Sequence, residues 1–350
     1  DDLKKVGRLA FRSIVYFEVV TTLALVIGLV MVNLTRPGVG VALGGAAAGQ
    51  PVPGTRTTLV GVLEHIVPQS VVDAAAQNEV LQVVFWSILF GLALTRVQGK
   101  PKELVLGLSA GLAEVMFKFT AIVMKVAPVG VFAALAYTVG HSGLRVLTSL
   151  GALILTLYVA LVVFVLAVLL PVALIARVPL VPLFRALKEP ALIAFSTASS
   201  EAALPLAMEN MATMGVPRRI VAFVIPVGYS FNLDGSTLYL AVASLFVAQA
   251  AGIHLSLSQQ LVMMLTLMVT SKGVAGVPRA ALVIPAATVT SFGLPLEAVA
   301  VLFGVDQLMD MARTAVNLVG NCLAAAVMAR WEGEYAWAAT AAADAAPAAP

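Results

Sequence analysis

Charged residues are scarce in this chain of 350 residues. Only 11% are Asp, Glu, Lys or Arg, whereas a soluble domain carries about 25%. Hydrophobic residues make up 61% of the chain, and its mean hydropathy is +1.01. Lipid offers no water to satisfy an open backbone, so helices are the simplest way for such a chain to cross a membrane. The composition therefore predicts an all-α integral membrane protein.

Cysteine and clustered charge are also nearly absent. The single cysteine, Cys322, excludes a disulfide within the chain. The net charge is only +3, and the basic residues stand at the ends of apolar segments rather than in one run, so we expect no nucleic-acid partner. The three histidines lie far apart and show no metal-ligand spacing. We therefore expect no cofactor.

Long apolar segments fill the first half, which we predict to be rich in scaffold helices over residues 1–177. About 20 apolar residues are enough to cross the hydrocarbon core. The sequence predicts spanning segments over residues 9–35, 57–96, 104–140 and 145–177. At the other end of the chain, residues 336–350 are rich in Ala and Pro, and we expect a disordered tail there.

The pattern changes in residues 178–335, which we predict to form a transport core. Residues 182–212 and 258–292 each hold two short apolar pieces around a Ser-rich or Gly-rich tip, as in a re-entrant helical hairpin. Each is followed by a longer segment, 217–250 or 295–330. A hairpin plus a span, present twice in succession, is typical of inverted repeats with a binding site between them.

One stripe of polar side chains runs along the last of these segments. Its members are Asp306, Asp310, Arg313, Asn317 and Asn321, spaced by four, three, four and four residues. At roughly 100° per residue they fall within an arc of about 80° on one helix face. Ionisable groups inside a membrane are costly and by default mark a substrate or ion path.

Within the stripe, Arg313 offers a planar fork for a carboxylate. The alternative is a structural ion pair with Asp310, but that pair alone leaves Thr314 and Asn317 beside it unexplained. Asp310 would hold a substrate ammonium, which distinguishes an amino acid from a plain dicarboxylate. Its alternative role is to neutralise Arg313.

Asp234 marks a second candidate site, because it stands with Asn232 and Gly235 at a break in segment 217–250. An unwound segment frees backbone carbonyls, and a carboxylate beside them suits a hard cation. The alternative is a capping Asp at a kink. Asp306 either organises this cation region or serves as a buried hydrogen-bond acceptor.

The two hairpin tips supply further candidates. Ser199 and Ser200 offer hydroxyls beside a helix N-terminus, which attracts anions, although they could serve only as caps. Glu201 is a candidate proton carrier, because desolvation raises the pKa of a carboxyl group. At the second tip, Gly273 and Gly276 allow the backbone to approach a ligand closely.

These motifs resemble the dicarboxylate/amino acid:cation symporter family, the glutamate transporter homologues, over about residues 7–335. The resemblance implies eight spanning helices and two hairpins, with this chain beginning at the third helix. It also implies a homotrimer in lipid whose protomers work by elevator-type alternating access. The matching segments are Ser199-Ser200-Glu201, Asn232-Leu233-Asp234-Gly235, residues 273–278 and residues 310–317.

The resemblance assigns roles to individual residues. Arg313 would hold the substrate's side-chain carboxylate and Asp310 its amino group. The rest of the substrate pocket would comprise Ser199, Ser200, Gly276, Val277, Thr314 and Asn317. The cation sites would use Gly228, Asn232 and Asn317 with Asn321, then Ser230 with Ser271, Lys272 and Val274, and finally Asn232 with Asp234.

The chain also departs from the family's sodium-coupled members. Asn321 stands where these members usually have Asp, so the first cation site loses a formal charge. Phe17 and Val20 stand where hydroxyl residues are usual, which leaves Thr21 alone. These differences favour coupling to protons, or to protons and sodium together, with Glu201 as a candidate for the proton.

The function predicted from the sequence is therefore import of glutamate and aspartate by a cation-coupled symporter. A C4-dicarboxylate symporter is the alternative, and the ammonium-binding role of Asp310 favours amino acids. We do not expect an enzyme: an intramembrane protease using Asp234 and Asp310 conflicts with Arg313, which would keep Asp310 ionised. A passive channel is the third possibility, but the expected orientation places the first hairpin entering from the cytoplasm and the second from outside, and such opposite gates favour alternating access.

The basic residues give the orientation. If the first span begins in the cytoplasm, most Lys and Arg side chains fall on the cytoplasmic side, and only Arg36, Arg56 and Arg145 fall clearly outside. We therefore expect a multi-pass protein of the bacterial inner (plasma) membrane with a cytoplasmic C-terminus.

Overall fold

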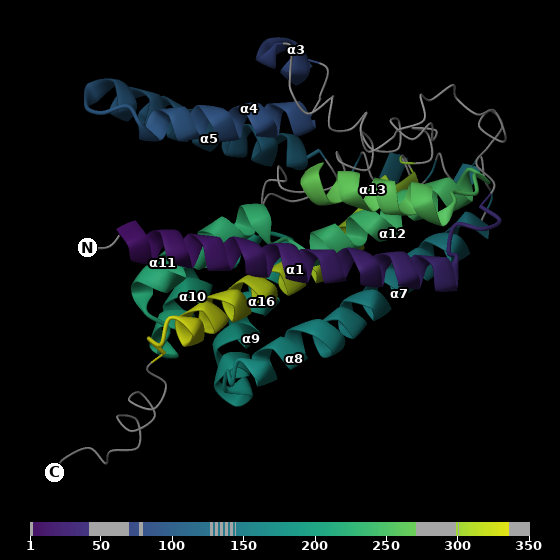
Figure 1. Ribbon diagram of the computed structural model, residues 1–350. Coiled ribbons are helices and arrows are strands. Elements are labelled where there is room, and N and C mark those ends of the chain that lie inside the picture. Colours follow the sequence, from purple (N-terminus) through teal and green to yellow (C-terminus); the bar gives the residue numbers. More distant parts are fainter. Residues whose placement is uncertain are drawn as a thin grey trace.

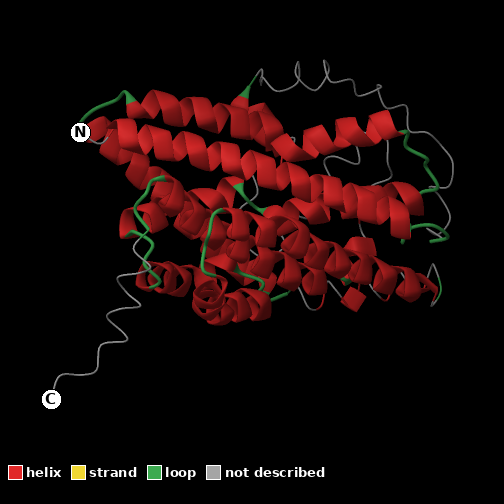
Figure 2. Ribbon diagram, turned by 60° about the horizontal axis from the view of Figure 1, so that its bottom comes forward, coloured by secondary structure: helices red, strands yellow, loops and turns green. Residues whose placement is uncertain are grey.

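A computed structural model describes residues 3–41, 70–76, 80–126, 145–270 and 301–335, with single positions between 129 and 143 and at 299. Every regular element in this part of the chain is a helix, as the composition predicts (Figures 1 and 2). The predicted second hairpin beyond residue 270, the start of the segment 57–96 and the tail lie outside the described residues.

The first and fourth predicted spans are present. Helix α1 covers Leu3–Thr35, and a second long helix runs through α7 (Arg145–Phe164), the π-helical turn η1 (Val165–Leu169) and α8 (Leu170–Ile175). Four helical stretches in the described residues are long and apolar enough to cross a membrane. They are Gly7–Thr35, Val146–Ile175, Arg218–Ala250 and Asp306–Trp331.

The first predicted hairpin folds as two short helices that pack against each other, α9 (Leu180–Thr197) and α10 (Ser200–Thr213). At 1.5 Å per residue α10 is about 21 Å long, less than the roughly 30 Å hydrocarbon core. After it, the predicted span 217–250 is interrupted as expected, into α11 (Arg218–Phe231) and α12 (Asp234–Ala250).

The last helix, α16, begins later than the sequence predicts. It covers Asp306–Trp331 rather than residues 295–330, and a 3₁₀ turn at Val301–Gly304 precedes it. Glycine weakens a continuous helix, and the carboxylate of Asp306 is stabilised in a first helical turn. Asp306 therefore opens the helix instead of lying within it.

Three of the remaining helices lie to one side of this group (Figure 1). They are α3 (Val71–Ala76), α4 (Val80–Thr95) and α5 (Lys100–Met124), and they fall within or near the predicted spans 57–96 and 104–140. Helix α13 (Leu257–Thr270) contacts α4, α12 and α1, and it forms the first part of the predicted second hairpin.

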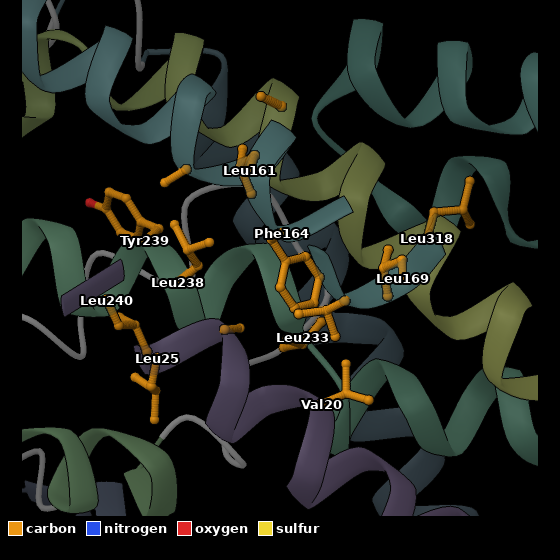
Figure 3. Close-up of a cluster of buried hydrophobic side chains, with 14 of the residues drawn as sticks. Val20, Leu25, Leu161, Phe164, Leu169, Leu233, Leu238, Tyr239, Leu240 and Leu318 are labelled. Carbon is orange, nitrogen blue, oxygen red and sulfur yellow. The ribbon is translucent and has the colours of Figure 1, made fainter. Parts of the chain in front are cut away.

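The core is formed where α1, α7, α12 and α16 pack together, and Figure 3 shows part of it. Phe164 is fully buried and belongs to the same cluster as Leu238 of α12 and Leu318 of α16, which Figure 3 labels. Helix α12 is buried along nearly its whole length. It is therefore a central element of the protein, so a site at its N-terminus is surrounded by packed helices.

One end of the bundle is tied together by charged side chains. Arg8 and Arg12 of α1 both bind Glu332, directly after α16. The hydrogen bond from Arg8, with the positive charges of Arg8 and Arg12, holds the pKa of the Glu332 carboxyl below its ordinary value. In addition, Arg219 pairs with Glu334. These contacts bring the start of α1, the start of α11 and the end of α16 to the same end of the bundle.

The crossing of α1 and α12 gives a testable prediction. A Cβ atom on Gly28 would lie 2.8 Å from the carbonyl oxygen of Leu238 and 2.9 Å from the Cβ of Ala241. We expect Gly28→Ala to force the two helices apart and to destabilise the protein by about 1–3 kcal/mol, as overpacking does. The measurement is the melting temperature of the purified protein in detergent.

Gly7→Ala is the matched control on the same helix, because nothing lies within 4 Å of the added methyl group. Alanine is the better helix former, so this variant should melt no lower than the parent. Equal melting temperatures for Gly28→Ala and the parent would contradict the close crossing.

Candidate functional site

The polar stripe of α16 lies inside the protein. Its exposed fractions are 0% for Asp306, 5% for Asp310, 0% for Arg313, 3% for Asn317 and 0% for Asn321. The helical spacing therefore correctly predicts one inward-facing stripe. Thr314, at 5%, lies beside it.

Arg313 is held by two carboxylates of its own helix. Its Nη1 donates to Asp306 Oδ1 at 2.9 Å, and its Nε donates to Asp310 Oδ1 at 2.8 Å. Thr314 Oγ1 donates to the same oxygen of Asp310 at 3.2 Å. The ion pair between Arg313 and Asp310, considered from the sequence, is thus present. Asp306 is a second buried acceptor for Arg313, which was one of the two roles predicted for Asp306.

Tyr239 of α12 completes the surroundings of Arg313. Its ring centroid lies 4.0 Å from the guanidinium carbon, a distance at which a cation is attracted to an aromatic face. Sequence reasoning did not identify this residue, because a tyrosine in an apolar helix most often packs in a core. Its place opposite Arg313 depends on how α12 packs against α16.

The break between α11 and α12 is real. Asn232 and Leu233 leave the helical conformation, with ψ angles of 60° and 64°. Helix α11 ends just before this break, and its last helical hydrogen bond runs from the Asn232 amide to the Gly228 carbonyl at 2.7 Å. Asp234 then lies in the first turn of α12, where the helix dipole favours a carboxylate.

Asn317 of α16 caps α12 from outside. Its Oδ1 accepts hydrogen bonds from the amides of Gly235 at 2.8 Å and Ser236 at 3.2 Å, and its Nδ2 donates to Ser236 Oγ at 2.9 Å. The first amides of a helix have no partner within the helix. The side chain of Asn317 thus fixes the N-terminus of α12 on α16, and its backbone carbonyl is the group predicted for a cation.

Close backbone approach makes this contact possible. A Cβ atom on Gly235 would collide with the carbonyl oxygen of Arg313. Only glycine lets α12 begin directly against the backbone of α16 at this point. The Gly of the Asn-Leu-Asp-Gly motif is therefore required by packing.

The residues predicted for the first and third cation sites lie together. Asn232 Nδ2 donates to Asp234 Oδ2 at 3.1 Å and to Asn321 Oδ1 at 3.0 Å. Gly228 lies against the Asn321 side chain. Among the described residues, the buried Asn232 Oδ1 and Asn321 Nδ2 have no hydrogen-bond partner. An unpaired buried oxygen suits a small cation or a proton donor, whereas the neutral amide of Asn321 supplies no charge to hold one.

Two residues of α1 that stand where sodium-coupled members of the family usually have hydroxyl residues are also buried. Phe17 and Val20 are 0% and 2% exposed. Thr21 donates its hydroxyl to the Phe17 carbonyl at 2.6 Å, within its own helix. This face of α1 therefore offers fewer oxygen ligands than hydroxyl residues at positions 17 and 20 would.

The first hairpin tip shows a cap and a buried serine. Ala198 adopts a left-handed conformation with φ 50°, and Ser199 Oγ accepts from the Ala202 amide at 3.4 Å as the N-cap of α10. Ser200 is buried, whereas Glu201 is exposed. Ser199 thus forms the expected cap, and its place in a substrate pocket stays a prediction, as does the proton-carrying role of Glu201.

The second cation site and the second gate remain predictions. Ser230 is exposed on α11. The residues predicted to join it or to close the pocket lie outside the described residues. They are Ser271, Lys272, Val274, Gly276 and Val277.

The buried ion pair predicts a large effect of neutralising Asp306. Asp306→Asn leaves the guanidinium of Arg313 with Asp310 alone, and breaking a buried pair costs about 3–5 kcal/mol. We expect a marked loss of thermal stability in detergent. The matched control is Glu209→Gln, which breaks the exposed 3.1 Å pair with Arg218 and should cost at most about 1 kcal/mol. Equal losses in the two variants would contradict the role given to Asp306.

Comparisons with known proteins show which family the chain belongs to. Residues 1–331 match the model of the sodium:dicarboxylate symporter family. The proton/glutamate-aspartate symporter of Escherichia coli K12 is 43% identical to this chain, over 95% of the chain and 78% of that protein. The proton/sodium-glutamate symport protein of Geobacillus stearothermophilus is also 43% identical, over 95% of the chain and 81% of that protein.

A third relative has a different named substrate. The C4-dicarboxylate transport protein of Rhizobium johnstonii is 42% identical, over 95% of this chain and 76% of that protein. The family consists of transporters rather than enzymes, so the proteolytic alternative is set aside. On the extent of these matches, this chain belongs to the sodium:dicarboxylate symporter family.

Proposed function

We propose that this protein is a secondary active symporter that imports glutamate and aspartate together with protons, sodium or both. The observation that carries the proposal is the buried arrangement of one guanidinium and two carboxylates at Arg313, Asp306 and Asp310. The relatives from E. coli and G. stearothermophilus, named as glutamate symporters, support the substrate class.

The charges suit a zwitterion with an acidic side chain. Arg313 has five N–H donors, and its contacts with Asp306 and Asp310 use only part of them. A substrate carboxylate would bind Arg313 while Asp306 keeps the guanidinium in place. Asp310 would then turn from Arg313 to the substrate ammonium. Thr314 and Asn317 would border the same pocket, with Ser199 and Ser200 at the first hairpin tip.

Cation binding would be completed beside the same pocket. Asn232 and Asp234 would hold one cation, and the carbonyls of Gly228, Asn232 and Asn317 another, next to Asn321. The cap that Asn317 forms on α12 supports this proposal, because it ties the cation region directly to the stripe that would bind substrate. A cation that tightens the break in α11 and α12 would therefore also order the substrate pocket.

Alternating access would follow the elevator scheme of the family, in a homotrimer in the inner membrane. The two hairpins would be re-entrant and belong to inverted repeats. The packing of α9–α12 around α16 supports a compact transport core over residues 178–335, and α1 and α7 pack on this core although they precede residue 178. The charged contacts that join α1, α11 and α16 at one end support a common cytoplasmic side for these helix ends and for the C-terminus.

The test of the function is uptake of radiolabelled aspartate into proteoliposomes under separately imposed sodium and proton gradients. We expect uptake by the parent protein and loss of at least about 100-fold in Arg313→Ala, since a charge-assisted contact to a carboxylate is removed from a buried site. Arg313→Lys keeps the charge without the planar fork and serves as the companion variant. Near-normal uptake by Arg313→Ala would sink the assignment.

Import of C4-dicarboxylates is the second candidate, favoured by the similarity to the Rhizobium protein. Asp310 decides between the two, because succinate has no ammonium. We expect Asp310→Ala to raise the KM for aspartate by about 10- to 100-fold, the value of one hydrogen bond to a charged group, without weakening competition by succinate. Succinate that competes with aspartate at equal affinity in the parent protein would instead support a dicarboxylate transporter.

A further inference from the structure

A tyrosine joins the first hairpin tip to the interrupted helix. Tyr229 of α11 donates its hydroxyl to the backbone carbonyl of Ser200 at 3.1 Å. Both residues are buried, with exposed fractions of 8% and 3%. A buried carbonyl without a donor has lost its water and gained no partner. Removing this hydrogen bond therefore costs more free energy than removing one at the surface.

Tyr229 stands in the last helical turn of α11, from Gly228 to Asn232, which leads into the candidate cation region. Its preceding neighbour, Gly228, accepts the 2.7 Å hydrogen bond from the Asn232 amide and lies against the Asn321 side chain. Asn232 in turn binds Asp234 and Asn321. Any change in the turn from Gly228 to Asn232 therefore moves the backbone that bears the Tyr229 side chain.

The hairpin can transmit such a movement because its two helices are fastened to each other. Pro190 lacks an N–H group and thus leaves the Ala186 carbonyl of α9 without its usual helical partner. Asn210 of α10 donates its Nδ2 to that carbonyl at 2.8 Å. Near the tip, the Ser199 amide donates to Thr197 Oγ1 at 3.2 Å. The two helices are therefore joined by a side chain away from the tip as well as by the tip itself, which allows the hairpin to shift as one unit.

We propose that Tyr229 is a positioning residue that couples occupation of the cation region to the place of the first hairpin tip. Its side chain holds Ser200 against α11 when the turn from Gly228 to Asn232 is in its closed form. The tip loosens when that turn opens. Since Ser199 and Ser200 belong to the proposed substrate pocket, the inference rests on the proposed function and adds a path by which the cation affects the substrate.

The test removes only the hydroxyl, with Tyr229→Phe. In proteoliposomes we expect the aspartate KM to rise by about two- to tenfold, the value of one hydrogen bond, with less change in the maximal rate. The dependence of that KM on the coupling ion should become weaker, because the tip no longer follows the turn. A role confined to folding would instead lower the maximal rate through the amount of active protein and leave the KM unchanged.

The position of the tip is measured by thiol labelling. Ser200→Cys keeps the backbone carbonyl, and Cys322→Ala removes the chain's only other thiol. Maleimide labelling, expressed relative to that of free cysteine at the same pH because only the thiolate reacts, should be slow when Tyr229 is present and slower still when sodium or protons are added. With Tyr229→Phe, labelling should be several-fold faster and should no longer respond to the ion.

Tyr158→Phe is the matched control. This substitution also removes a phenolic hydroxyl that donates to a backbone carbonyl, that of Leu308 at 2.9 Å. The hydrogen bond that it removes joins α7 to α16 and does not involve the hairpin. It should leave the labelling of Ser200→Cys unchanged.

Where uptake is measurable, the inference requires both the change in KM and the change in labelling, and a change in only one of them overturns it. Faster labelling in Tyr158→Phe as well would also overturn it, because the effect would not be specific to the hairpin tip. If the parent protein takes up neither glutamate nor aspartate, the proposed function fails, whereas the ion-dependent labelling still decides whether Tyr229 couples the turn to the tip.

Discussion

The arrangement of the site depends on one fully buried arginine. A guanidinium without water must be compensated nearby, and Arg313 finds its partners in Asp306 and Asp310, with the ring of Tyr239 against its face. These charges are buried on one face of α16, which points into the bundle, and α12 packs against that face through Tyr239. Asn317 lies one turn further along on the same face, so the cap on α12 and the polar stripe are parts of one arrangement.

The break between α11 and α12 is the second constraint. Unwinding two residues inside a packed bundle leaves backbone groups that need partners, and Asn317 and Gly228 supply some of them. What remains is a small cluster of amide and carboxylate groups in which the buried Asn232 Oδ1 has no hydrogen-bond partner among the described residues. In the proposed function, the same departure from helical structure would supply both the ligands for an ion and the contact through which the neighbouring helices respond to it.

Much of this could be predicted from the sequence where local geometry decides. The spacing of Asp306 to Asn321 requires one face if the segment is helical, and the Asn-Leu-Asp-Gly motif indicates an interruption. The start of α16 was predicted too early, because apolar residues before Gly304 carry no signal that distinguishes a 3₁₀ turn from a helix. The ring of Tyr239 over Arg313 and the cap formed by Asn317 could not be predicted, since both depend on how helices far apart in sequence pack.

The placement of both counter-charges on α16 itself has a consequence for synthesis of the protein. Asp310 lies one turn from Arg313 and Asp306 two turns from it, so the pairing needs no other helix. A lone arginine at the centre of a membrane helix costs several kcal/mol during insertion. Helix α16 therefore brings its own compensation into the bilayer, and it can stay there with its charges paired until the other helices pack around it.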